Sequence, residues 1–131
     1  MIIDSSALIA ILREEPDARS FARAIEEADD VKISAATLFE ASIVADGAQD
    51  GNVRRRFDDV CRDTGLIVMP FDSEQARIAR EAYRSFGKGS GHKARLNFGD
   101  CFAYALARVT GEPLLYKGTD FQQTDVASAL D

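Results

Sequence analysis

Short apolar segments alternate along this chain with longer segments whose apolar residues recur every three or four positions. The short segments predict buried strands at residues 1–3, 31–33, 66–70 and 114–116. The longer segments predict amphipathic helices at residues 4–12, 17–28, 34–45, 53–64, 72–83 and 98–109. No tight hairpin turn joins neighbouring strands. We therefore expect crossover connections and a mostly parallel central sheet with helices on both faces, a three-layer α/β/α fold.

Two of these segments are expected to lie deep inside the layers. Residues 66–70 form a continuous apolar run, which is typical of a strand buried on both faces. The helix over 34–45 carries the large apolar residues Leu38, Ile43 and Val44, and we expect this set to pack on the sheet.

Polar residues mark several predicted helix starts. Asp4 and Asp17 each precede an apolar-periodic segment, where a carboxylate accepts hydrogen bonds from the first helical N–H groups. Asp72 and Gln75 have the spacing of a capping box. Asn97 stands just before the last helix and is expected to cap it.

The pattern is interrupted by a segment with three glycines, Gly87, Gly89 and Gly91. Ordering so many glycines is entropically costly, so we expect residues 87–97 to form a mobile loop. No acidic residue occurs between positions 82 and 99. The basic residues of that stretch are Arg84, Lys88, His92, Lys93 and Arg95.

Composition limits the classes of protein to which the chain can belong. It has 131 residues, of which 46% are apolar and 29% charged, as expected for a single soluble domain over residues 1–131. Uncharged runs are far shorter than the roughly 20 residues of a membrane-spanning helix. A basic signal-peptide start is missing, and Cys61 and Cys101 do not form a Cys-x-x-Cys pair. We expect a cytoplasmic protein with no membrane segment.

Four acidic residues stand where predicted strands end or the following helices begin. They are Asp4, Glu40, Asp100 and Asp120. The carboxyl ends of parallel strands meet at one edge of a sheet, so all four can face one cleft. Each acid also has a purely local interpretation. Asp4 can cap its helix and Asp100 can complement a helix dipole. Glu40 can form a capping box with Thr37, and Asp120 can stabilise a turn.

Gathered acids imply a cation, because like charges within a few ångströms destabilise one another unless a counter-charge offsets them. Oxygen ligands with no cysteine pair favour Mg²⁺, or Mn²⁺ as a substitute, over zinc. Mg²⁺ retains open positions for water and phosphate oxygens, which points to phosphoryl chemistry. The net charge of −6 leaves nucleic-acid binding to local basic patches.

Two motifs resemble those of a known family. Residues 1–12, MIIDSSALIAIL, resemble the opening of PIN-domain ribonucleases of the VapC toxin type, and residues 96–107, LNFGDCFAYALA, resemble their second acidic motif. The closing segment 114–121, LLYKGTDF, and the size of the chain are also similar. The resemblance implies a PIN-like fold over the whole chain.

The resemblance also implies roles for individual residues. Asp4 and Asp100 would bind the divalent ion, with Glu40 completing the site directly or through water. Asp120 would be the fourth acid, although Asp125 competes for that assignment. The hydroxyls beside these ligands, those of Ser5, Ser6 and Thr119, are candidates to orient water or carboxylates. Candidate RNA contacts, which come from the basic loop rather than from the family, are Lys88, His92, Lys93 and Arg95.

The function implied is that of a Mg²⁺-dependent endoribonuclease toxin, in which a metal-activated water hydrolyses RNA phosphodiester bonds. A VapB-like antitoxin would hold it inactive, and the toxin itself would form a homodimer.

Other functions remain open. A receiver-like phosphoacceptor domain also gathers acids at strand ends, with Lys117 as its lysine and Asp72 as its acceptor. A haloacid-dehalogenase-like phosphatase would need an aspartate where Ser6 stands, which argues against it. A catalytically inactive binding module is a further interpretation.

Overall fold

A computed structural model describes residues 1–130 and contains a four-stranded, all-parallel sheet at its centre. The strands are β1 (Ile2–Ile3), β2 (Lys32–Ser34), β3 (Ile67–Met69) and β4 (Leu114–Leu115). Their order is β3-β2-β1-β4, so the first strand of the chain is central. Ile2 of β1 is in register with Lys32 on one side and Leu114 on the other. The prediction of a mostly parallel sheet is confirmed.

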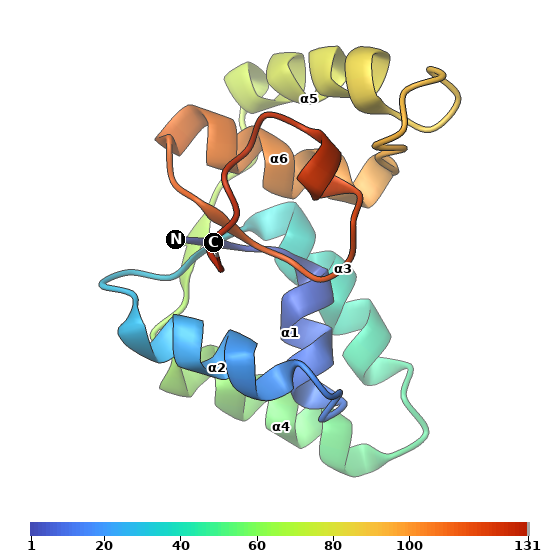
Figure 1. The fold of residues 1–131 in the computed structure, drawn as a ribbon. Helices are drawn as coiled ribbons and strands as arrows, with labels where there is room; N and C mark the ends of the chain where they lie inside the picture. Colours follow the sequence, from blue (N-terminus) through green and yellow to red (C-terminus); the bar gives the residue numbers. More distant parts are fainter. Residues whose placement is uncertain (131) are drawn as a thin grey trace.

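Helices cover both faces of this sheet (Figure 1). They are α1 (Ser5–Leu12), α2 (Ala18–Glu27), α3 (Ala35–Asp46), α4 (Gly51–Asp63), α5 (Ser73–Phe86) and α6 (Phe98–Thr110), followed by the short 3-10 helix η1 (Phe121–Gln123). Figure 1 shows α5 and α6 stacked on one side and α1, α2 and α4 on the other. The three-layer α/β/α prediction is therefore correct. Within residues 1–130, no helix combines the length and apolar character that crossing a membrane requires.

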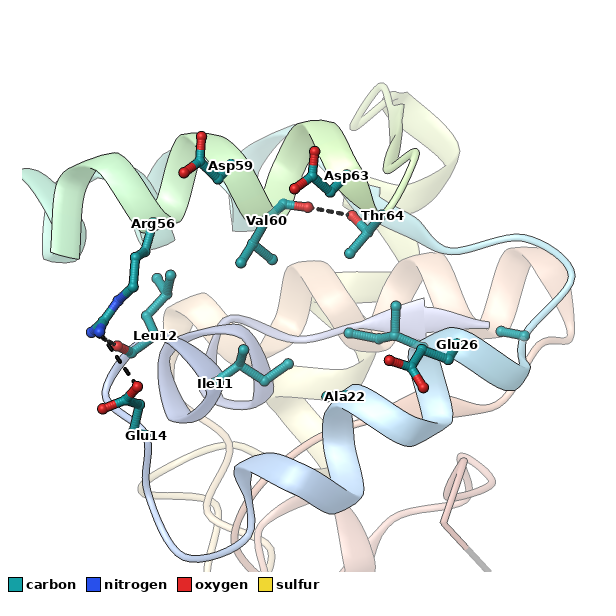
Figure 2. Close-up of a pocket in the computed structure, with 12 residues that line it drawn as sticks. Ile11, Leu12, Glu14, Ala22, Glu26, Arg56, Asp59, Val60, Asp63 and Thr64 are labelled. Atoms are coloured by element: carbon teal, nitrogen blue, oxygen red, sulfur yellow. Dashed lines mark hydrogen bonds and ion pairs between the residues drawn. The ribbon is translucent and has the colours of Figure 1, made fainter. Parts of the chain in front are cut away.

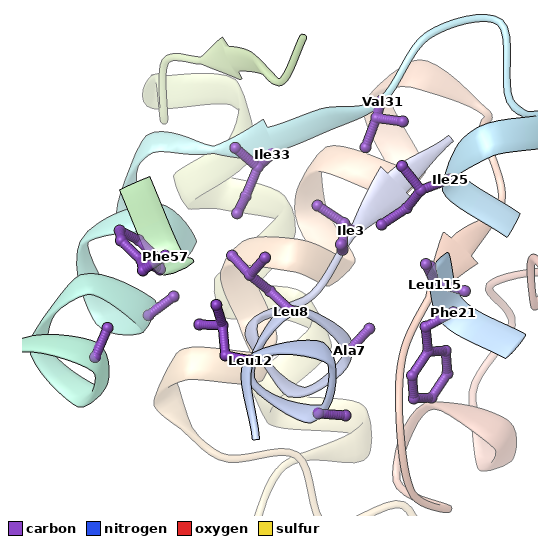
Figure 3. Packing of buried hydrophobic residues seen from close by; sticks show 13 residues of the cluster. Ile3, Ala7, Leu8, Leu12, Phe21, Ile25, Val31, Ile33, Phe57 and Leu115 are labelled. Carbon is purple, nitrogen blue, oxygen red and sulfur yellow. The ribbon is translucent and has the colours of Figure 1, made fainter. Parts of the chain in front are cut away.

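The alternation of side chains along the short strands creates two separate cores. Ile3 and Leu115 point into a cluster with α1, α2 and α4, which includes Leu8 and Phe21 (Figure 3). Their neighbours Ile2 and Leu114 point to the opposite face and pack against α6. Because successive residues of a strand face opposite sides, two apolar residues per strand are enough to join both helical layers to the sheet.

The prediction that residues 66–70 form a deeply buried strand is wrong. Only Ile67–Met69 is a strand, and its side chains are largely outside the core, with Ile67 38% and Val68 47% exposed. The reason is the strand order: β3 lies at the edge of the sheet and pairs only with β2. An apolar run alone does not distinguish a central strand from an edge strand.

Two of the three residues of α3 that were predicted to pack on the sheet do not do so. Ile43 is 56% exposed and Val44 is exposed as well, whereas Leu38 packs partly against the core. The buried positions of α3 are the small residues Thr37, Ala41 and Ala45. Small side chains let α3 approach its neighbours closely, which turns the larger apolar residues outward.

Three of the predicted caps are present and one is not. Asp4 accepts a hydrogen bond from the Ser6 N–H and Asp72 accepts one from the Gln75 N–H. Gln75 does not close a capping box, because its side-chain amide donates to the Pro70 carbonyl instead. Asp17 precedes α2 but makes no capping bond; its carboxylate pairs with a lysine from another part of the chain. Asn97 caps α6, as described below.

Residues 87–97 form the expected loop, but both ends are anchored. Gly87 and Leu96 form a β-bridge, and the Lys88 N–H donates to the Leu96 carbonyl. Ala94 and Leu96 are fully buried. The freedom that the glycines provide is therefore confined to the tip of the loop, away from its junction with α6.

Helix α6 ends at Gly111, whose φ of 69° lies in the left-handed region. A side chain there would crowd the following carbonyl, so Gly111→Ala is expected to lower the free energy of unfolding by about 1 kcal/mol. Gly111→Asn should cost less, because asparagine tolerates this conformation. Urea unfolding of the three proteins measures the difference. Equal midpoints for the parent and the alanine variant would contradict the prediction.

Candidate active site

The acidic residues gather at the carboxyl end of the central strands, in a cleft of about 470 Å³. Asp4 directly follows β1, and its N–H donates to the Leu115 carbonyl at 2.9 Å, which fixes it beside the end of β4. The cleft is lined by Asp4, Ser5, Ser6, Ile9, Arg13, Glu15, Glu40, Val44, Asn97, Asp100 and Lys117. Three of the four predicted acids therefore share one cleft, although they lie far apart in the sequence.

Asp4 is the most deeply placed acid, with 3% of its surface exposed. Its Oδ2 oxygen accepts hydrogen bonds from the Ser6 N–H at 3.0 Å and from the Ser6 hydroxyl at 2.6 Å. Its Oδ1 oxygen is buried and has no hydrogen-bond partner within residues 1–130. Burial raises the pKa of Asp4, the Ser6 hydrogen bonds lower it, and the charge of Glu40 raises it further.

Glu40 reaches the cleft from the second turn of α3. Its Oε1 oxygen accepts a hydrogen bond from the Ser5 hydroxyl at 2.9 Å. The helix begins at Ala35, with Ser34 at the capping position. Thr37 therefore lies inside the helix and is not its cap, which rules out the capping-box interpretation of Thr37 and Glu40.

Asp100 lies in the first turn of α6 and forms a reciprocal pair with Asn97. The Asn97 side chain accepts from the Asp100 N–H at 2.9 Å, and Asp100 Oδ2 accepts from the Asn97 N–H at 3.0 Å. The predicted cap at Asn97 is confirmed, and Asp100 participates in it. Burial raises the pKa of Asp100 to about 6, and the charges of Asp4, Asp120 and Glu40 add to that rise.

Asp120 lies beside this cleft rather than in its lining. It is exposed, just ahead of η1, and it is close enough for its charge to raise the pKa of Asp100. Asp125 is engaged elsewhere, because it accepts a hydrogen bond from the Tyr104 hydroxyl at 2.6 Å and pairs with Arg108 at 3.2 Å. Of the two, Asp120 is the one whose charge reaches Asp100. Thr119 is exposed, and no hydrogen bond joins its hydroxyl to any acid of the described chain.

The basic loop does not reach into the cleft. Lys88, Lys93 and Arg95 are exposed on the loop that leads into α6. His92 is held within the loop itself: its Nδ1 accepts from the Ala94 N–H at 3.0 Å, and its ring meets the edge of Phe86 with centroids 5.0 Å apart. This placement gives His92 a local structural role.

Arg13 and Lys117 line the cleft instead. Neither residue was predicted from the sequence to belong to this acidic site. Arg13 follows α1 on the same face as Ser6 and Ile9, and this helical spacing was a usable signal. Lys117 follows β4; its N–H donates to the Ser6 hydroxyl at 3.0 Å. No local pattern predicts that its ammonium group pairs with Glu15 and Asp17 at 3.0 and 3.2 Å, because those contacts depend on the fold.

The arrangement is suited to a hard cation that takes few protein ligands. Within residues 1–130, no three acidic, histidine or cysteine side chains converge into a complete cage for a metal ion. Asp4 nevertheless offers one oxygen fixed by serine and one buried oxygen without a partner, and Asp100 adds a second carboxylate nearby. Two carboxylates with space for water and phosphate is the coordination that Mg²⁺ commonly takes.

Comparisons with known proteins agree with this geometry. The PIN domain family model matches residues 1–127. Ribonuclease VapC28 of Mycobacterium tuberculosis is 50% identical over 131 residues, which is 100% of this chain and 98% of that protein. Ribonuclease VapC42 of the same organism is 43% identical over 129 residues, or 98% of each chain.

Solved structures share the fold at lower identity. VapC20 of M. tuberculosis, described as a sarcin-ricin loop cleaving toxin, has a TM-score of 0.75 at 15% identity, covering 96% of this chain and 95% of that one. FitAcB from Neisseria gonorrhoeae has a TM-score of 0.71 at 24% identity, covering 97% and 94%. The chain therefore belongs to the PIN-domain family, and its full-length relatives there are VapC ribonucleases.

Proposed function

We propose that this protein is a Mg²⁺-dependent endoribonuclease that acts as the toxin of a toxin-antitoxin pair. The observation that carries the proposal is the buried, unpartnered Oδ1 oxygen of Asp4, in a cleft that also holds Asp100 and Glu40. An isolated buried carboxylate among like charges is unstable, and a divalent cation removes that cost. The full-length relatives named as ribonucleases indicate RNA as the substrate.

Asp4 and Asp100 are the proposed ligands, with Mn²⁺ as an alternative to Mg²⁺. Ser6 holds one oxygen of Asp4, and the other oxygen is buried without a hydrogen-bond partner. Ser5 holds the Glu40 carboxylate, which with Asp120 keeps the site strongly negative. When bound, the ion polarises the scissile phosphate and lowers the pKa of the attacking water.

RNA binding at a protein of net charge −6 depends on local cations. Arg13 at the cleft is best placed to contact a phosphate beside the acids. Lys88, Lys93 and Arg95 extend the basic surface along the approach to α6. These side chains contact backbone phosphates, so they position the RNA without selecting a sequence.

The signalling-domain alternative receives no support from this geometry. Asp72 follows the edge strand β3, and its carboxylate caps α5. Lys117 lines the acidic cleft and pairs with Glu15 and Asp17, whereas Asp72 does not line that cleft. No second function is therefore proposed.

A groove between α1, α2 and α4 is the proposed binding site for the antitoxin (Figure 2). It has a volume of about 570 Å³, and its floor includes the apolar residues Ile11, Ile25 and Val60. Four acids line it, Glu14, Glu26, Asp59 and Asp63. Arg56 pairs with Glu14, and Arg62 pairs with both Asp59 and Asp63, so the acids around the groove still outnumber the arginines that pair with them. An amphipathic antitoxin segment with basic flanks matches both properties.

A second copy of the chain is proposed to cover an apolar surface formed by α3 and α6. Phe39, Ile43 and Phe98 are 66%, 56% and 77% exposed. Phe98 continues into an aromatic row with Phe102 and Phe71, with centroids 4.9 and 4.7 Å apart. Exposed aromatic residues in contiguous groups are typical of protein interfaces.

Asp4→Asn and Asp100→Asn are each expected to reduce Mg²⁺-dependent cleavage of a structured RNA by at least about 100-fold, because each removes a charged ligand while preserving shape. The assay compares Mg²⁺ with EDTA and follows folding by circular dichroism. Asp72→Asn is the matched control, since it also caps a helix after a strand but lies outside the cleft, and it should retain activity. Equal activity in all three variants would refute the assignment.

Cleavage at limiting Mg²⁺ is expected to rise with pH between 5 and 7 and then level off. Asp100 must lose its proton to bind a cation, and its pKa is raised to about 6, so metal affinity falls about tenfold per pH unit below that value. The same raised pKa means that the metal-free fold binds more protons than the unfolded chain, so its stability declines as pH rises from about 4 to 6. A flat rate profile from pH 5 to 7 would argue against Asp100 as a ligand.

Ile43→Asp is expected to convert a dimer into a monomer, because it places a charge within the apolar surface that the second copy is proposed to cover. Light scattering after size-exclusion chromatography measures the mass. Val109→Asp is the control: Val109 is 40% exposed at the opposite end of α6 and should leave the dimer intact. The interface assignment fails if Ile43→Asp remains dimeric.

A further inference from the structure

The helical conformation of α6 does not explain why residue 99 is a glycine. Gly99 is the second residue of α6, buried and without a positive φ, so its backbone conformation is open to any residue. Alanine would be the better helix former at this position. The requirement for glycine must therefore come from the space that a side chain would occupy.

That space is occupied by the carboxylate of Glu40. A Cβ atom built on Gly99 would lie 2.0 Å from Glu40 Oε2 and 2.9 Å from Oε1, both far below van der Waals contact. The carboxylate thus rests directly on the backbone at the amino end of α6, next in sequence to Asp100. The partial positive charge of a helix amino end favours a carboxylate there.

Three helices fix the position of Glu40 through small residues. Its own helix, α3, supplies the side chain; α1 supplies the Ser5 hydroxyl, which donates to Oε1 at 2.9 Å; and α6 supplies the bare backbone of Gly99. Any side chain at position 99 would leave the Ser5 hydroxyl in place but would occupy the space that now holds Glu40 Oε2.

We propose that Gly99 is a positioning residue that seats the Glu40 carboxylate in the acidic cleft. The significance of this seat for catalysis rests on the metal-dependent nuclease function proposed above. The atoms that a Cβ would meet belong to the free end of a flexible side chain, not to backbone. A substitution at Gly99 therefore displaces the carboxylate and leaves the helix where it is.

This arrangement makes stability and metal binding respond in opposite directions to Gly99→Ala. The melting temperature of the metal-free protein should equal or exceed that of the parent, because alanine stabilises the helix and Glu40 can move away. The dissociation constant for Mn²⁺, measured by calorimetry, should increase about tenfold, as is typical when the support of a metal site is disturbed. Gly51→Ala is the matched control: Gly51 opens α4 with no atom within 4 Å of its Cβ position, and it should leave Mn²⁺ binding unchanged.

A double-mutant cycle separates positioning from a general effect on the fold. In a Glu40→Ala background, Gly99→Ala should cause no further loss of Mn²⁺ affinity, because the displaced group is already missing. Additive losses in that cycle would overturn the proposal.

A metal-free readout separates this proposal from the proposed function. In a crystal structure of metal-free Gly99→Ala, the Glu40 carboxylate should have left its place beside residue 99 while α6 stays in position. A carboxylate that remains there, with α6 shifted instead, would overturn the proposal. If the parent binds no Mn²⁺ and cleaves no RNA, the nuclease function fails, and this structure still decides the role of Gly99.

Discussion

The burial of one carboxylate at the end of the central strand is the constraint on which the rest of the site depends. Asp4 is 3% exposed and close enough to Glu40 and Asp100 for their charges to interact. Two hydrogen bonds from Ser6 offset part of that cost but satisfy only one of its oxygens. The remaining cost lowers the stability of the protein, and it is the cost that a cation bound under the proposed function would offset.

The sequence was sufficient to predict the fold class and the shared cleft of Asp4, Glu40 and Asp100, because both follow from local signals. Asp4 directly follows β1, and Asn97 and Asp100 open the helix α6 that leads into β4. Both positions therefore lie at the carboxyl edge of a parallel sheet whatever the strand order. The exposure of β3 and of Ile43 could not be predicted, because burial on a particular face depends on which elements become neighbours. The Lys117 contacts were missed for the same reason.

Similarity in sequence and similarity in fold support different conclusions about this protein. The relatives at 43–50% identity extend over nearly the whole chain, so they carry the family assignment. The structural neighbours at 15–24% identity show that the same layers form around very different side chains. In this chain those layers bring side chains from α1, α3 and α6 together at the carboxyl end of the parallel sheet.

One short turn, residues 13–15, lies between the acidic cleft and the groove formed by α1, α2 and α4. Arg13 and Glu15 border the acidic cleft, whereas Glu14, between them, borders the groove on the opposite side of the turn. Glu14 has a φ of 52°, an unfavourable conformation for a residue with a side chain, and Lys117 holds the next residues of the turn by two ion pairs. The acidic cleft and the groove therefore share three consecutive residues of backbone, and neither lining can be altered at this turn without involving a residue adjacent to the other.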